Sequence, residues 1–140
     1  MQDSQANCGP YALRNGLQAL GIERNANELE SACRTSATNG TPTRNIIAAA
    51  NKIDGCRPLK LFEKRRDIAL MRLAEALRRG RPVLLSWRSE TPGDHWVVAV
   101  GVLGDRYLVA DSAESELVLS MAVDDLEARW RDTNYEGVIL

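Results

Sequence analysis

Cys8 and His95 are the two residues of this 140-residue chain whose types are best suited to covalent chemistry. Cys8 precedes Gly9, Pro10 and an apolar repeat, so it should lie at the N-terminus of the first helix. Unpaired backbone N–H groups and the helix dipole at that position favour a thiolate, which is the nucleophilic form of cysteine. The alternative is a small buried hydrophobe, which is the usual role of a free cysteine.

His95 is the only histidine in the chain, so any cysteine–histidine mechanism must use it. It follows the turn-rich stretch ETPGD and begins an apolar strand, which predicts a ring at the edge of a sheet. Together with Cys8, it is a candidate general base, although a lone histidine is also compatible with a purely structural place. Two carboxylates could orient its ring: Asp94, whose side chain should face the other way in the strand, and Asp111.

Asp111 would accept a hydrogen bond from the imidazole and stabilise its charged form. The turn at 104–105 decides whether it can do so. A two-residue turn in a regular hairpin places Asp111 opposite Val98, pointing away from His95. A longer turn or a β-bulge places it opposite Val97, on the face of the histidine. The hypothesis therefore requires an odd turn or a bulge; otherwise the aspartate is a strand-end cap.

The oxyanion of a tetrahedral intermediate also needs hydrogen-bond donors. The Cys8 backbone N–H and the side-chain amide of Gln2 or Gln5 could supply them, although a glutamine so close to the terminus could instead be a surface residue. Gly9 would let a substrate approach the sulfur closely. Trp96 could form a wall of the substrate cleft or anchor the core, as expected for Trp87 and Trp130.

The elements that must position these residues follow from periodicity and turn signals, and they predict an α+β fold with N-terminal helices packed on a C-terminal antiparallel sheet. Helices are expected over 10–21, 25–34, 41–55, 66–80 and 122–130, and strands over 57–63, 81–87, 95–103, 106–113, 116–121 and 135–140. Asn25 and Thr41 are predicted N-caps, with Pro42 as the first helical residue. The buried side of the 66–80 helix should carry Ile68, Met71, Leu73, Ala74 and Leu77.

The composition predicts one soluble domain spanning 1–140, with 44% hydrophobic and 26% charged residues. A net charge of −1 gives no reason to expect a nucleic-acid partner. No apolar run is long enough for a membrane span and no signal peptide is apparent, which predicts a cytoplasmic location. Cys8, Cys33 and Cys56 are odd in number and widely spaced, so we expect reduced thiols, no metal site and no cofactor.

These residues together resemble the papain-like cysteine peptidases that process bacteriocin leaders at a double glycine. Gln2 and Cys8 match the Q-x5-C-G-x-x-A-L pattern of that family, the strand HWVVAVG begins at His95, and the strand YLVAD ends at Asp111. The segments VDDLEARW and GVIL are also similar, so the likeness covers nearly the whole chain. The resemblance implies a papain-like fold with Cys8 as nucleophile, His95 as base and acid, Asp111 as the orienting residue and Gln2 as an oxyanion donor.

The sequence departs from this family where Ser112 replaces the usual proline, and where no transporter segment follows. The resemblance therefore implies a stand-alone bacterial peptidase domain that acts on a peptide or protein substrate. Two alternatives remain open. The same residues could pass an acyl group to an amine, as in an acyltransferase or a transglutaminase-like enzyme. A peptidase-like module could also bind a peptide strand at its sheet edge without cutting it.

Overall fold

The computed structural model describes residues 8–34, 40–88, 94–111 and 118–140 of the chain. Gln2, Gln5 and Ser112 lie outside these ranges, and so do the side chains of Arg88 and Asp94. The predicted roles of Gln2 and Gln5 therefore stay predictions.

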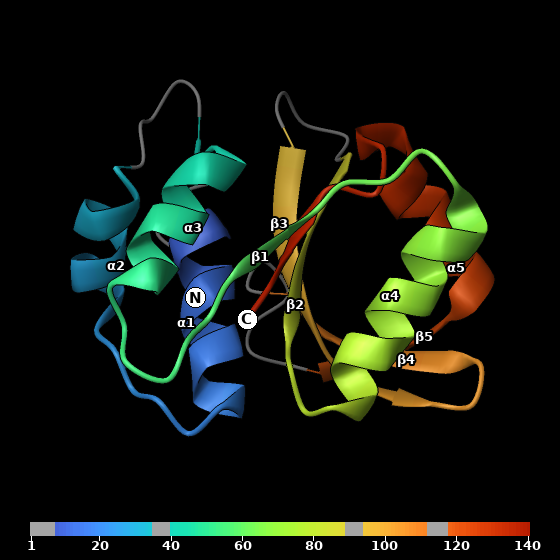
Figure 1. The fold of residues 1–140 in the computed structure, drawn as a ribbon, viewed down its shortest axis with the longest axis horizontal. Coiled ribbons are helices and arrows are strands. Elements are labelled where there is room, and N and C mark those ends of the chain that lie inside the picture. Colours follow the sequence, from blue (N-terminus) through green and yellow to red (C-terminus); the bar gives the residue numbers. More distant parts are fainter. Residues whose placement is uncertain (1–7, 35–39, 89–93, 112–117) are drawn as a thin grey trace.

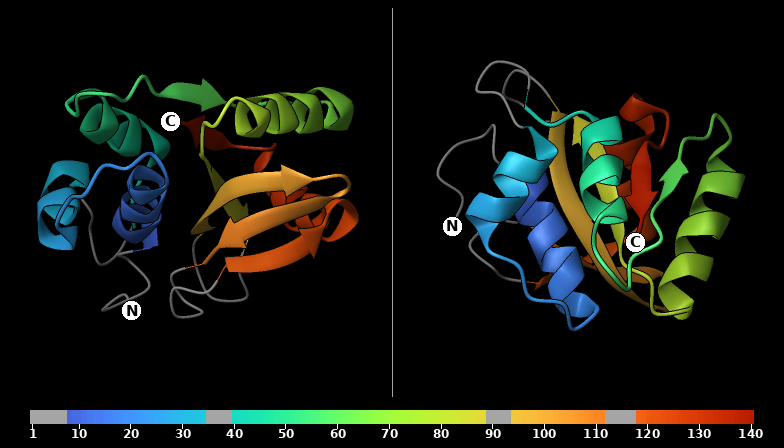
Figure 2. Two further views of the ribbon diagram at one scale, coloured as in Figure 1. Left: turned by 90° about the horizontal axis from the view of Figure 1, so that it is seen from below. Right: turned by 60° about the vertical axis from the view of Figure 1, so that its left-hand side comes forward.

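An antiparallel sheet of six strands forms the centre of the described part of the chain, with helices on both faces (Figures 1 and 2). Its strand order is β1-β6-β2-β3-β4-β5. The strands are β1 (Leu59–Leu61), β2 (Val83–Arg88), β3 (Asp94–Leu103), β4 (Arg106–Ala110), β5 (Val118–Ala122) and β6 (Gly137–Ile139). From β2 to β5 each strand pairs with the next one in the sequence. The last strand, β6, instead lies between β1 and β2.

Three helices lie on one side of the sheet: α1 (Cys8–Ala19) and α3 (Thr43–Asn51) pack on it, and α2 (Ala26–Cys33) packs on these two helices. The apolar repeat of α1 buries Leu13 and Leu17 completely, in one core cluster with Leu84 of β2 and Val98 of β3. α2 begins as predicted, because the Asn25 side chain accepts a hydrogen bond of 2.7 Å from the backbone of the second residue of the helix. This face therefore confirms the predicted packing of N-terminal helices on the sheet.

The other face is covered by α4 (Arg66–Arg78) and α5 (Val123–Trp130), which is followed by a 3-10 turn (Arg131–Thr133). Val97 and Ala99 of β3 belong to the core on this side, whereas Trp96 and Val98 belong to the core beneath α1. Successive side chains of a strand point to opposite faces, so β3 supplies both cores.

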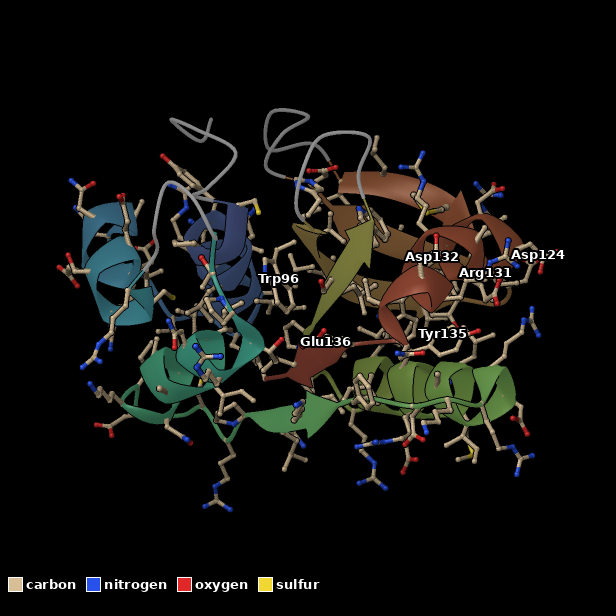
Figure 3. All side chains as sticks on the ribbon, turned by 90° about the horizontal axis from the view of Figure 1, so that it is seen from above. Trp96, Asp124, Arg131, Asp132, Tyr135 and Glu136 are labelled. Atoms are coloured by element: carbon tan, nitrogen blue, oxygen red, sulfur yellow. The ribbon has the colours of Figure 1, made fainter. Side chains whose placement is uncertain are left out.

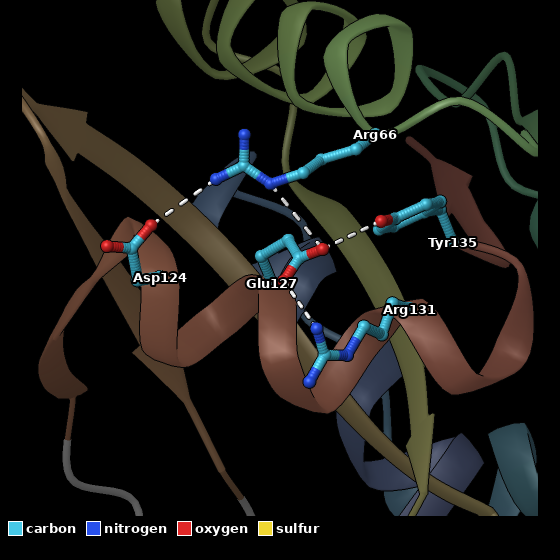
Figure 4. A network of polar contacts seen from close by, with 5 residues as sticks. All are labelled: Arg66, Asp124, Glu127, Arg131 and Tyr135. Atoms are coloured by element: carbon cyan, nitrogen blue, oxygen red, sulfur yellow. Dashed lines mark hydrogen bonds and ion pairs between the residues drawn. The ribbon is translucent and has the colours of Figure 1, made fainter.

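A buried carboxylate fixes α5 to its surroundings (Figure 4). Glu127 is 7% exposed and accepts a hydrogen bond of 2.8 Å from the Tyr135 hydroxyl. The same side chain pairs with Arg66 of α4 at 3.5 Å and with Arg131 at 3.8 Å. Burial and the hydrogen bond to Glu127 raise the pKa of Tyr135 above its usual range. Removing one partner would leave a buried charge less well compensated, which is the costly case for such networks.

Three details differ from the sequence predictions or refine them. α3 begins at Thr43, because Pro42 is extended and is itself the N-cap, so Thr41 is not the cap. Met71 is 59% exposed. It lies about 200° around α4 from Ala69, which defines the buried side with Leu73 and Leu77. Ile68 is only half-buried. The three tryptophans are core anchors as predicted, being 3%, 4% and 0% exposed in chain order.

Candidate active site

Cys8 is the first residue of α1, and its sulfur lies against the beginning of β3. The backbone N–H of Trp96 donates a hydrogen bond of 3.4 Å to Cys8 Sγ. The first turn of α1 contains no acidic residue, so no side chain of that turn competes with a thiolate for the positive end of the helix dipole. In Figure 1, α1 and β3 both begin at the upper end of the molecule. The structure thus places the sulfur where the helix N-terminus and a backbone donor both favour negative charge.

A β-bulge decides where Asp111 lies. β3 and β4 are joined by a two-residue turn, with Leu103 paired to Arg106. The register then shifts between Ala99 and Gly101, so that Val98 pairs with Ala110. Continuing this register places the next residue, Asp111, opposite Val97 and on the face of His95. Of the two arrangements that the hypothesis allowed, an odd turn or a bulge, the structure contains the bulge.

His95 and Asp111 form a direct hydrogen bond. The distance between His95 Nε2 and Asp111 Oδ1 is 2.7 Å. Both side chains are largely shielded, at 9% and 16% exposure. Because Nε2 faces the carboxylate, Nδ1 is the ring nitrogen left for the sulfur. The sequence prediction that these two residues are brought together is confirmed as geometry.

The histidine is held in its charged form by its two neighbours. Burial alone lowers the pKa of His95, because it disfavours the imidazolium. Hydrogen bonds to Asp111 and Cys8, and the charges of both, outweigh burial and raise its pKa from 6.5 to about 9. Cys8 is thus one of the two residues whose proximity stabilises the charged ring. At neutral pH the site holds an imidazolium between a carboxylate and a sulfur.

The other two cysteines have a different environment. None of the three is in a disulfide, and all are buried. Burial raises the pKa of Cys33 to about 12. Burial also raises the pKa of Cys56, although the charges of Arg24 and Arg81 oppose it. Both thiols are therefore protonated at neutral pH.

Gly9 and Trp96, the predicted substrate-binding residues, both touch Thr41. A Cβ added at Gly9 would lie 2.6 Å from Thr41 Cβ and 2.6 Å from its Oγ1, so close packing requires glycine here. Trp96 is 4% exposed, and its indole Nε1 donates a hydrogen bond of 3.0 Å to the Thr41 carbonyl. A contact of either residue with substrate stays a prediction. The role of Thr41 was not foreseen, because it depends on residues distant in the sequence.

Nothing in the described ranges points to a bound metal or to a membrane span. They contain no group of three or more His, Cys, Asp or Glu side chains arranged to hold a metal ion. None of their helices is both long enough and apolar enough to cross a bilayer.

The architecture is that of the C39 papain-like peptidase domains. The peptidase domain of Streptococcus ComA, a bi-functional ABC transporter involved in quorum sensing, superposes with a TM-score of 0.78 at 19% identity, covering 98% of this chain and 92% of that one. A putative C39-like peptidase from Bacillus anthracis gives 0.75 at 14% identity, over 96% and 88%. A double glycine motif protease from an AMS/PCAT transporter, in complex with its leader peptide, gives 0.72 at 17% identity, over 99% and 86%.

The chain belongs to the Peptidase_C39-like family, whose model matches residues 1–138. The papain-like resemblance deduced from the sequence is thereby confirmed. A comparison with curated protein sequences found no match.

Proposed function

We propose that this protein is a cysteine peptidase that hydrolyses a peptide or amide bond through Cys8. The observation that carries the proposal is the 2.7 Å hydrogen bond between His95 and Asp111, with the Cys8 sulfur bonded to the backbone of Trp96, the residue next to His95. A thiolate, an imidazolium and an orienting carboxylate are the groups that acyl transfer through cysteine requires.

In the acylation half-reaction, Cys8 Sγ attacks the carbonyl carbon and a C–S bond forms. The carbonyl oxygen becomes an oxyanion, which the Cys8 backbone N–H and the Gln2 side chain would stabilise. As the C–N bond breaks, the imidazolium of His95 gives its proton to the leaving amine. A pKa of about 9 keeps this proton on the ring at neutral pH until it is needed.

Deacylation requires the opposite behaviour from the same ring. Acylation removes the negative charge of the sulfur, which is one of the causes that raise the pKa of His95. The pKa of the ring therefore falls in the acyl-enzyme. His95 then takes a proton from water, the hydroxide oxygen bonds to the acyl carbon, and the C–S bond breaks to release a carboxylic acid and restore the ion pair. Asp111 stabilises the imidazolium each time it forms and holds the ring in place while it is neutral.

The substrate class that we infer is a peptide. The support is the similarity to a double glycine motif protease whose structure contains a leader peptide, over 99% of this chain at 17% identity. We therefore choose a peptide containing a double glycine as the first probe. Products analysed by mass with and without an added amine separate hydrolysis from transfer, and binding without product would favour the non-cutting module.

The test that needs no substrate is the alkylation of the three cysteines by iodoacetamide at pH 6.5. Exposure alone ranks Cys56 first at 8%, then Cys8 at 2% and Cys33 at 0%. The proposal predicts instead that Cys8 reacts fastest, because the thiolate is the reacting species. In full-length protein, a Cys8→Ala variant should lose both the fast phase and peptide cleavage. A reactivity order that follows exposure would contradict the proposal.

A further inference from the structure

Thr41 contacts the chain neighbours of both members of the proposed catalytic pair. Its side chain packs against Gly9, next to Cys8, and its carbonyl binds the indole of Trp96, next to His95. Thr41 is 6% exposed and Trp96 is 4% exposed, so both contacts are buried. The separation between α1 and the start of β3 therefore depends on where the segment 41–43 lies.

The segment 41–43 is anchored at its other end to the sheet through Glu136. The Thr43 hydroxyl donates a hydrogen bond to Glu136 Oε1, and Thr43 is 7% exposed. This bond joins the first residue of α3 to the residue just before β6. Pro42, the N-cap of α3, makes no side-chain hydrogen bond, so the start of this helix is tied to the sheet through its neighbours: Thr41 bonds to Trp96 and Thr43 bonds to Glu136.

The backbone of Glu136 is itself fixed on the sheet. Its carbonyl accepts a hydrogen bond of 3.0 Å from Ser86 N and one of 2.9 Å from Trp130 Nε1. Leu85 pairs with Gly137, and Ser86 pairs with Trp96, so one row of the sheet runs from Glu136 through Ser86 to Trp96. Residues directly opposite each other share a face, so Glu136 and Trp96 point to the same side. Figure 3 shows both between the helices of that side and the strands.

We propose that Glu136 is a positioning residue for the reaction at Cys8. Its hydrogen bond to Thr43 holds the segment 41–43 at a fixed height above the sheet, and that segment holds Gly9 and Trp96 in place. The sulfur and the imidazole are thereby kept in contact although they belong to different layers. This inference rests on the proposed function, since it concerns the geometry of the same pair.

The test compares the pH profile of Cys8 alkylation, from pH 5.5 to 9.5, in the full-length protein and four variants. Glu136→Ala removes the acceptor and Thr43→Val removes the donor with little change of shape. Both should slow alkylation at pH 6.5 by about tenfold or more, because only the thiolate reacts and a thiol without a charged partner is only about 1% ionised at that pH. At high pH their rates should approach that of the parent, because an isolated thiol also ionises there. Glu136→Gln and Thr43→Ser keep an acceptor and a donor, and should keep the profile of the parent.

A matched control removes a similar polar contact that involves α4, on the other face of the sheet. Glu63 forms an ion pair of 2.8 Å with Arg72, and the two side chains are 25% and 33% exposed. Glu63→Ala should lower stability without changing the alkylation profile. Reaction of Cys33, which is fully buried, reports any unfolding of a variant.

The possible outcomes separate the inference from the proposed function. If the parent shows no excess reactivity at Cys8 over Cys33 and Cys56, the proposed function fails and this inference fails with it. If the parent shows that excess and folded Glu136→Ala and Thr43→Val retain its profile, only the positioning role is wrong. If Glu63→Ala slows Cys8 alkylation at pH 6.5 as much as Glu136→Ala does, the effect comes from lowered stability, and the inference is also wrong.

Discussion

Replacing Asp111 with asparagine should release the proton that the site holds on His95. The pKa of the histidine is about 9 instead of 6.5, a difference that favours the imidazolium by about 3 kcal/mol. Burial acts in the opposite direction, so the neighbours of the ring must supply more than this difference. A carboxylate in contact with a charged group shifts the pKa by about 1 to 3 pH units. Asparagine keeps the shape and an acceptor but removes the charge, so the pKa of His95 should fall by an amount in that range.

The assay is an NMR titration of the imidazole, which is unambiguous because the chain contains one histidine. The ring of the parent should remain protonated through pH 8, whereas in Asp111→Asn a large fraction should lose its proton before that pH. Asp105→Asn is the matched control, since it removes the same charge at an exposed position in the hairpin turn. If both variants titrate like the parent, the carboxylate does not hold the imidazolium and the orienting role is wrong.

Three further predictions concern pH and packing. Above pH 9 the imidazolium loses its proton and cannot protonate a leaving amine, so kcat/KM for peptide cleavage should decline there; a rate that continues to rise would contradict the role of His95 as acid. Gly9→Ala should lower the free energy of unfolding measured in urea, because overpacking against Thr41 costs about 1–3 kcal/mol and the higher helix propensity of alanine offsets only about 1 kcal/mol. A more stable variant would mean that Gly9 and Thr41 are not tightly packed. Deleting Val100 should yield a regular hairpin in which Val97 still lies opposite Asp111, so the raised pKa of His95 should persist in an NMR titration. A normal histidine pKa in a folded variant would mean that the bulge does more than set the register.

Much of the fold was predictable because its signals are local. The apolar repeat of α1, the Asn25 cap of α2 and the turn between β3 and β4 each involve residues a few positions apart. The position of β6 was not predictable in this way. Its pairing with β1 and β2 joins segments more than 50 residues apart, and no turn signal specifies it.

The site, like the fold, was predictable where its signals are local and not where they depend on tertiary packing. The residue types of Cys8 and His95 indicated the chemistry that we propose, and counting along the hairpin showed that Asp111 could face His95 only with an odd turn or a bulge. The sequence did not reveal that the Trp96 backbone would donate to the sulfur or that Thr41 would touch both sides of the site. These contacts arise from tertiary packing between α1, α3 and β3, and a backbone donor has no sequence signature.

The location of the site at the end of the sheet follows from the alternation of β3. Cys8 packs with Trp96 in the core beneath α1, whereas Asp111 follows Ala110 on the face of Val97, in register with the opposite core. Within the body of the sheet, a side chain of β3 reaches one of these faces and not the other. The pairing of β3 with β4 begins at Val98 and Ala110, so His95 lies beyond it. At this position β4 does not run beside His95, and its ring has room on both faces of the sheet. A histidine can therefore contact a carboxylate on one face and a sulfur on the other only where the strands end. The start of β3 is such a position, and this is why Cys8 and His95 can meet there.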